Sequence, residues 1–305
     1  MTTVITAAAT VAAPADGPAA AVLLAGRASR ECLAEARLSP DAVGLLINVG
    51  VYREHNTFEP AVAALVQKEA GINLDYLADP VPGAAFSFDL MNGACGVLNA
   101  VQVAQAMLAT GSTERVLITA ADVHPGGRAA LDPHYPYADL GAALLLERSA
   151  GAEGGFGPVR TAGSTEPSAV AGYLPTAGMR AGGRSMITVR REAGFADQLL
   201  DLAAATAAEY ARAEGLDLDR TLLVTSRPTA DFAQRLAARL GLPASAALAP
   251  DAPGPGAGLP HTAAPILGYL EAVAEGLPAG VDQLLFVAAG AGPSAACVSY
   301  RPLDR

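Results

Sequence analysis

The sequence predicts an α/β protein in which parallel strands are covered by helices. Short runs rich in Val, Ile and Leu alternate along the chain with longer Ala-rich amphipathic segments, a pattern typical of this class. The residues are 51% hydrophobic and only 16% charged, so the chain can bury a large core. A length of 305 residues corresponds to about two domain-sized units.

The alternation predicts the elements of the first half in order. Strands are expected at residues 3–8, 43–49, 85–89, 116–120 and 142–147. Helices are expected at residues 20–35, 60–70 and 95–109. A Gly/Pro-rich stretch at 123–136 is expected to be a loop, the place where such scaffolds often carry function.

A second series of elements begins after the Gly-rich stretch 151–157. Strands are expected at residues 159–164, 185–189, 221–225, 283–288 and 295–300. Helices are expected at residues 192–214, 228–240 and 264–275, with a second Gly/Pro-rich loop at 249–260. The predicted elements therefore repeat one plan twice, and we divide the chain into the halves 1–155 and 156–305.

Charge and cysteine content exclude several classes of protein. The net charge of -10, from 20 basic and 30 acidic residues, argues against nucleic-acid or anionic-membrane binding. Cys32, Cys95 and Cys297 lie far apart without ligand spacing, so we expect neither disulfides nor a metal site. The first residues lack the basic region of a signal peptide and no apolar stretch is long enough to span a bilayer. We expect a soluble, cytoplasmic protein.

The segment 86–111, FSFDLMNGACGVLNAVQVAQAMLATG, is the most informative part of the sequence. A β-type run ends in a turn of small residues, and Cys95 opens a long helix. Amides and the macrodipole at a helix N-terminus stabilise a thiolate, so a lowered pKa and a nucleophilic role are expected for Cys95. The alternative for any free cysteine is a buried structural role.

This segment resembles the active-site turn of the thiolase-fold condensing enzymes, in the β-ketoacyl carrier-protein synthase III branch. The resemblance extends to VLITAADV at 116–123, YADLGAALLLER at 137–148 and AAGAGPSAACVSY at 288–300. It implies two similar βαβαβαββ halves in a five-layered αβαβα body. The first half would carry the nucleophile and a dimer interface, and the second would carry the rest of the active site.

The resemblance also implies a catalytic set of Cys, His and Asn, of which this sequence keeps only part. Cys95 matches the nucleophile. The family's HQAN-like motif corresponds to residues 225–229, TSRPT, which contain no histidine. The family's NTSAAS-like motif corresponds to residues 259–265, LPHTAAP, where the polar residue is His261. The set resembles the rearranged triads of ketosynthase-III-like acyltransferases.

A single histidine beside a cysteine favours acyl transfer to an alcohol or amine over decarboxylative condensation. Decarboxylative condensation needs two convergent donors for the enolate, and loss of one commonly costs on the order of a hundredfold or more. A histidine can instead deprotonate an alcohol or amine while the acyl group is on Cys95. An acid orienting His261 is expected, and Asp251 and Asp231 are both candidates.

Other residues receive roles from the resemblance, each beside a simpler interpretation. Glu59, before Pro60, matches a catalytic Glu of head-to-head condensing members, or it caps the helix that follows. The amides of Cys95 and of Ala291, in the turn 290–292, would form the oxyanion hole, or the glycines there merely make a tight turn. Histidines 124 and 134 are interpreted as exposed or locally capped loop residues.

The basic residues offer two clusters for substrate docking. Arg235 and Arg239 lie where the family docks its acyl carrier protein, and Arg180, Arg184, Arg190 and Arg191 form the second cluster. A solvated basic face explains either cluster equally well. The chain has no Trp for the usual coenzyme A clamp and no P-loop, so we expect no bound cofactor and an acyl thioester of carrier protein or coenzyme A as substrate.

Three functions remain open from the sequence. The first is an acyltransferase of natural-product or fatty-acid-type metabolism, in which Cys95 takes the acyl group and His261 activates a small alcohol or amine acceptor. The second is a decarboxylative or head-to-head condensing enzyme. The third is a ketosynthase-like partner subunit without catalysis. A homodimer or a ketosynthase-like heterodimer is expected in each case.

Overall fold

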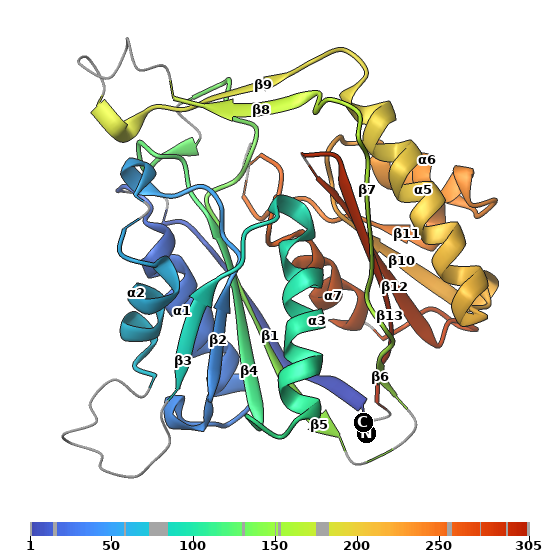
Figure 1. Cartoon of the computed structure of the whole chain (residues 1–305), viewed down its shortest axis with the longest axis horizontal. Coiled ribbons are helices and arrows are strands. Elements are labelled where there is room, and N and C mark those ends of the chain that lie inside the picture. Colours follow the sequence, from blue (N-terminus) through green and yellow to red (C-terminus); the bar gives the residue numbers. More distant parts are fainter. Residues whose placement is uncertain are drawn as a thin grey trace.

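Two sheets face one another across a pair of central helices, α3 (Gly96–Ala109) and α7 (Ala264–Ala274) (Figure 1). The outer helices of the first half are α1 (Ala21–Glu35) and α2 (Val62–Ala70). Those of the second half are α5 (Phe195–Glu214) and α6 (Phe232–Arg239). Helices and sheets therefore alternate in the predicted αβαβα order.

The computed structural model describes most of the chain. The described residues are 2–14, 17–57, 59–72, 85–129, 132–149, 151, 154–174, 183–254, 258–274, 276–290 and 292–303. Among these residues, no helix combines the length and the apolar character needed to cross a membrane.

The five-stranded sheet of the first half has the order β1-β5-β4-β2-β3. Its strands are β1 (Thr2–Ala12), β2 (Leu45–Asn48), β3 (Phe86–Asp89), β4 (Arg115–Asp122) and β5 (Leu140–Ser149). Strands β3, β2 and β4 are parallel, while β5 is antiparallel to β4 and β1. The carboxyl ends of the parallel strands therefore meet at one edge, with polar residues Asn48, Asp89 and Asp122.

The second half repeats this arrangement. Its sheet has the order β11-β10-β12-β13-β6, with β7 also paired to β13. The strands are β6 (Gly155–Phe156), β7 (Arg160–Gly163), β10 (Thr221–Thr225), β11 (Ala247–Leu248), β12 (Gln283–Gly290) and β13 (Ser294–Arg301). A separate hairpin of β8 (Val170–Tyr173) and β9 (Thr188–Arg191) extends across the top of both halves in Figure 1.

Three apolar cores hold the layers together. The largest joins both sheets through α3 and α7 and includes Val101, Ile118, Ile266 and Phe286. A second packs α1 and α2 on the first sheet, and a third packs α5 and α6 on the second. Burial of apolar surface on both faces of each sheet explains the nearly continuous hydrophobic runs in β4 and β12.

Most predicted elements are confirmed within a few residues, and the differences matter for function. Strand β4 runs to Asp122, two residues beyond the predicted end, because its pairing with β5 continues as far as Leu140. Helix α2 starts at Val62 rather than at residue 60. The strand predicted at 185–189 is β9, Thr188–Arg191, which starts three residues later because a short 3-10 helix, Gly183–Ser185, precedes it.

Candidate active site

Cys95 lies in a tight turn between β3 and α3. The 3-10 helix Gly93–Cys95 forms this turn, and Cys95 is the N-cap residue of α3. The Asn92 side chain donates to Asn99 Oδ1 at 2.7 Å, which ties the turn to the helix. The turn is therefore placed as the sequence predicted, with the cysteine at the start of a central helix.

The surroundings of the Cys95 thiol are more enclosed than the sequence suggests. Cys95 is fully buried, and its Sγ lies 3.5 Å from the carbonyl oxygen of Ala288 and 3.6 Å from that of Ser294. Burial raises the pKa of the thiol to about 11, against opposing hydrogen bonds from Ser294 and Ala296. The lowered pKa expected from the helix N-terminus is wrong in direction, because burial of the thiol is the largest influence on its pKa. The resting residue is a thiol.

The raised pKa predicts how Cys95 reacts with iodoacetamide. Its alkylation rate should rise about tenfold per pH unit from pH 7 to 9, because the thiolate fraction grows in that proportion below the pKa. Peptide mapping would separate Cys95 from Cys32 and Cys297, which are also buried. Ser294→Ala should slow the reaction at each pH, since the Ser294 hydroxyl favours the thiolate. A rate that levels off near pH 7 would show a resting thiolate instead.

His261 is held by a buried carboxylate that the sequence analysis did not select. His261 Nδ1 lies 3.0 Å from Asp122 Oδ2. The same oxygen accepts hydrogen bonds from the Thr262 amide at 3.1 Å and the Thr262 hydroxyl at 2.6 Å. Asp122 Oδ1 accepts the amides of Val51 and Tyr52, at 2.9 and 2.8 Å. Every oxygen of this carboxylate is therefore satisfied by hydrogen bonds.

The charge of Asp122 decides which nitrogen of His261 is available. Burial alone would raise the pKa of the Asp122 carboxyl, but the charge and hydrogen bond of His261, with further hydrogen bonds from Thr262 and the nearby backbone, lower it to about 2. An ionised carboxylate only accepts hydrogen bonds, so the proton of the neutral imidazole belongs on Nδ1. His261 Nε2 is then a proton acceptor, which is the arrangement of a general base with its orienting acid.

The imidazole faces the nucleophile turn. Gly93 has a positive φ of +49°, and a Cβ built on it would lie 3.6 Å from His261 Nε2. A Cβ built on Gly290 would lie 3.4 Å from the amide nitrogen of Ala94, which belongs to the same turn. The structure thus brings Cys95 and His261 to one turn from different halves. Among the hydrogen bonds of the described residues, none joins the two side chains directly.

Two tyrosine rings pack beside the imidazole of His261. The Tyr137 ring centroid lies 4.2 Å from that of His261, and the Tyr52 centroid lies 5.4 Å away. Tyr137 directly follows the loop predicted at 123–136. The close packing of these rings limits rotation of the imidazole and keeps Nε2 toward the turn.

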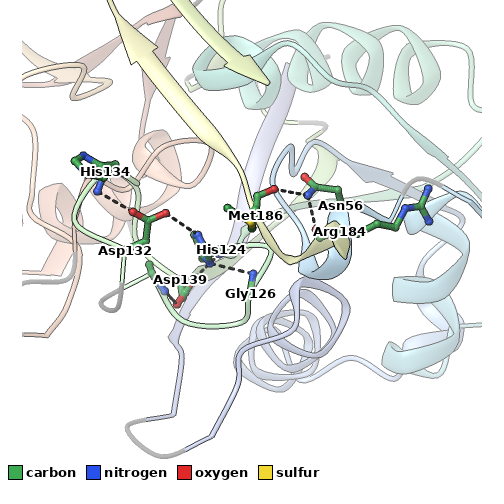
Figure 2. Close-up of polar contacts among 9 residues, drawn as sticks. Asn56, His124, Gly126, Asp132, His134, Asp139, Arg184 and Met186 are labelled. Atoms are coloured by element: carbon green, nitrogen blue, oxygen red, sulfur yellow. Dashed lines mark hydrogen bonds and ion pairs between the residues drawn. The ribbon is translucent and has the colours of Figure 1, made fainter. Parts of the chain in front are cut away.

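The loop that carries Tyr137 is fixed by the buried His124 and by Asp139 (Figure 2). His124 Nδ1 accepts the Gly126 amide at 3.0 Å, and Nε2 lies 3.1 Å from Asp132. The two oxygens of Asp139 accept the amides of His124 and Ala129, each at 2.6 Å. The interpretation of His124 as locally capped is confirmed, although the residue is not on the surface.

A small open pocket leads to His261. Its walls include Tyr137, Phe195, Ser226 and Ala289, with Ala94 of the nucleophile turn. Cys95 itself is not among the lining residues, because its side chain lies on the inner side of the Ala94–Gly290 contact. A molecule in this pocket would touch His261 before it reached the thiol.

Comparison with known proteins identifies the fold. No family model and no curated protein matches the sequence. Among solved structures, 3-oxoacyl-(acyl carrier protein) synthase III of Pseudomonas aeruginosa aligns over 100% of this chain and 99% of its own, at 16% identity and a TM-score of 0.78. The protein has the thiolase fold.

Two further structures with the thiolase fold match over nearly their whole length. The priming β-ketosynthase of the R1128 polyketide biosynthetic pathway is 17% identical, with 99% and 96% of the two chains covered and a TM-score of 0.76. OleA of Xanthomonas campestris is 16% identical, with 99% and 98% covered and a TM-score of 0.76. The resemblance inferred from the turn around Cys95 is therefore confirmed at the level of the fold.

Ser226, in the segment that the resemblance aligned with the HQAN motif, offers no donor to a substrate. Ser226 is buried there. Its hydroxyl accepts the Ala289 amide at 2.9 Å and lies 3.3 Å from the Ala289 carbonyl oxygen. The hydroxyl therefore closes the connection between β10 and β12 and is not available to a substrate.

The two acids predicted to orient His261 lie elsewhere. Asp251 forms an ion pair with Arg227 at 2.9 Å. Asp231 accepts the Thr229 hydroxyl at 2.7 Å and lies 3.9 Å from Arg235. Asp122 occupies the place that was expected for one of them, because β4 delivers it to the edge of the first sheet that faces the turn before α7.

The oxyanion hole expected from the resemblance can be followed at only one of its two amides, that of Cys95. The Cys95 amide donates to the Asn92 carbonyl oxygen at 3.0 Å, within the 3-10 turn. Ala291 lies outside the described residues, and the amide of its neighbour Gly292 donates to Ser168 Oγ at 3.2 Å. A role for the Cys95 and Ala291 amides stays a prediction, and for Cys95 it requires the turn to open.

Glu59 does not cap α2. Glu59 is exposed, and the first amides of the helix, those of Val62 and Ala63, donate instead to Asp89 at 2.8 and 2.9 Å. The capping interpretation is therefore wrong, because the helix starts later than predicted. The role of Glu59 as a base shared with a partner subunit stays a prediction.

Arg235 and Arg239 lie one turn apart on α6 and both pair with α5. Arg235 pairs with Asp197, and Arg239 with Asp201 at 2.6 Å. These ion pairs reduce the net positive charge that the two arginines can offer to an acidic carrier protein. Docking at this place stays a prediction.

Proposed function

We propose that the protein is an acyltransferase that moves an acyl group from a thioester, through Cys95, to an alcohol or amine. The observation that carries the proposal is the Asp122–His261 pair, with Nδ1 held at 3.0 Å and Nε2 toward the nucleophile turn. An imidazole oriented by a buried carboxylate is suited to take a proton and to carry the resulting charge.

The reaction would proceed in two steps. Cys95 Sγ bonds to the carbonyl carbon of the donor thioester, the donor C–S bond breaks, and the proton of the thiol ends on the departing thiol. The acceptor hydroxyl or amine then attacks the acyl-Cys95 carbonyl while His261 Nε2 takes its proton. The bond to Cys95 breaks, and the proton returns from His261 to sulfur. Asp122 stabilises the imidazolium formed in between.

Ester or amide formation is favoured over decarboxylative condensation by the second half of the site. An enolate would need two convergent donors. The described site offers one imidazole, the hydroxyl of Ser226 is engaged with the backbone of Ala289, and the guanidinium of Arg227 is already paired with Asp251. The proposal therefore ranks condensation second.

The proposal also includes the acyl donor and the oligomeric state of the protein. The donor would be an acyl group on a carrier protein or on coenzyme A, and the acceptor a small molecule. A second copy of the chain or a ketosynthase-like mate would complete a dimer. The non-catalytic role considered from the sequence gives no reason for a buried Asp–His pair facing a cysteine turn.

The proposal is tested by intact mass spectrometry of the purified protein with acetyl, malonyl and longer acyl thioesters. Wild type should gain one acyl group and Cys95→Ala none. On addition of amine and alcohol acceptors, the adduct should disappear with formation of an amide or ester. Release of CO₂ together with a β-keto product would instead establish condensation, and a wild-type protein that no thioester acylates would contradict catalysis by the isolated chain.

A further inference from the structure

Two arginines line the pocket that leads to His261, and no acid does. Arg191, the last residue of β9, and Arg227, after β10, both contribute to its wall. The described lining residues include no Asp or Glu. In a protein of net charge -10, a cationic pocket of this kind requires an explanation.

Among the described residues, the partners of Arg191 are aromatic side chains, and one of them, Tyr137, also hydrogen-bonds to it. Its guanidinium carbon lies 5.8 Å from the Tyr137 ring centroid and 5.2 Å from that of Phe195. The adjacent Arg190 is paired with Glu192 at 2.8 Å, whereas no carboxylate of the described chain is within ion-pair distance of Arg191. A half-buried cation without an anion favours binding of one.

The position of Arg191 relative to His261 is fixed by the hairpin β8–β9. Figure 2 shows Asn56 donating to the carbonyl oxygens of Arg184 and Met186, at 2.6 and 2.9 Å. His55 Nδ1 also lies 3.1 Å from Ser185 Oγ. These contacts anchor the hairpin on the first half. The Tyr137 ring is a neighbour of both the Arg191 guanidinium and the imidazole of His261, at 5.8 and 4.2 Å from its centroid.

Arg227 supplies a second, independent observation. Its Nη atoms bind the Ala249 carbonyl oxygen at 2.5 Å and Asp251 at 2.9 Å. Its Nε is buried and has no hydrogen-bond partner in the described structure. A buried donor without an acceptor is costly, so a ligand that brings an acceptor to this wall would be stabilised.

We propose that the pocket binds a carboxylate on the acceptor, held by Arg191 with support from Arg227, so that the hydroxyl or amine of a hydroxy or amino acid meets His261. This inference rests on the proposed acyl transfer. Planar guanidinium groups match carboxylates in geometry and charge. Val170, Phe195 and Leu199 line the same pocket and would contact an apolar side chain of the acceptor.

The carboxylate is assigned to the acceptor rather than to the donor by the place of the pocket. His261 lines it, while Cys95 lies behind Ala94 and Gly290. The molecule beside Arg191 is therefore the one whose proton His261 can take. A malonyl donor also carries a carboxylate, and the experiment separates these two sources.

Direct binding tests the inference without any acyl transfer. Lactate, 3-hydroxybutyrate, 3-phenyllactate, alanine and phenylalanine would each be titrated beside the uncharged carboxamide by calorimetry. At least one acid should bind at least about tenfold more tightly than its carboxamide. Arg191→Gln should remove that preference, Arg191→Lys should keep part of it, and the paired, exposed Arg190→Gln should leave it unchanged. Circular dichroism would verify that each variant folds.

Transfer kinetics then identify the source of the carboxylate. With acetyl-loaded enzyme, Arg191→Gln should raise KM for the preferred acid by about tenfold or more, with the rate of acetyl loading unchanged. Equal binding of every acid and carboxamide would overturn the inference. A defect of Arg191→Gln confined to loading from malonyl thioester would also overturn it, by assigning the carboxylate to the donor. Failure of wild type to acylate would refute the proposed function, while the binding titrations would still decide the role of Arg191.

Discussion

His261→Ala is expected to accept an acyl group on Cys95 and then to hold it. Acylation of Cys95 does not involve an acceptor, so it does not need His261 as the base for one. Transfer of the acyl group to the acceptor does need it, because in the proposed mechanism Nε2 takes the acceptor proton. Removal of a catalytic histidine commonly lowers turnover by about 10⁴-fold or more. Intact mass should therefore show a long-lived acyl-enzyme in the variant, where wild type with acceptor shows none.

The matched control for this variant is His134→Ala. His134 is exposed on the loop before Tyr137, and its backbone amide donates to Asp132, so removal of its ring should leave transfer intact. An acyl-enzyme that turns over at the wild-type rate in His261→Ala would refute the role of His261 as the base. Loss of loading in the same variant would show that His261 also activates the thiol.

Asp122→Asn is expected to lower turnover by about 10³- to 10⁴-fold with a smaller effect on acceptor binding. An asparagine that turns its NH₂ group toward Nδ1 would place the imidazole proton on Nε2, which then cannot accept one. The measurement is the pH profile of kcat beside KM. At high pH the activity should not recover, because the defect lies in the tautomer rather than in a titration.

Asp231→Asn is the control for this substitution. Asp231 binds Thr229 and lies near Arg235 on the surface of the second half, so its loss should leave kcat nearly unchanged. Since Asp122 also accepts the amides of Val51 and Tyr52, thermal unfolding of Asp122→Asn must be recorded beside the kinetics. A folded Asp122→Asn protein with wild-type kcat would remove Asp122 from the mechanism.

The fold was largely predictable because its strands and central helices are buried on most sides. Continuous apolar runs such as those of β4 and β12 identify strands without reference to distant residues. The ends of elements were less predictable, because they depend on pairing partners. The error at the end of β4 had the largest consequence, since it ended the predicted strand at residue 120 and left Asp122 outside it, rather than at the carboxyl end of a parallel strand.

The active site could be predicted only in part. Cys95 and His261 were found from local patterns, but the contact between His261 and Asp122 joins residues 139 positions apart. An acid that directly follows a buried strand was the available signal. The pKa of Cys95 was mistaken for a different reason, because the helix terminus is visible in the sequence and the depth of burial is not. Arg191 could not be told from its basic neighbours until their ion pairs were known.

The proposed base and the acid that orients it come from opposite halves of the molecule. Asp122 ends a strand of the first sheet, and His261 lies in the turn before α7 of the second half. The 3.0 Å distance between His261 Nδ1 and Asp122 Oδ2 therefore depends on the position of one half relative to the other. A small shear between the two sheets would part the pair while leaving each half's secondary structure intact. Catalytic competence should thus be more fragile than the fold itself, and it should disappear first as the protein is warmed or exposed to denaturant.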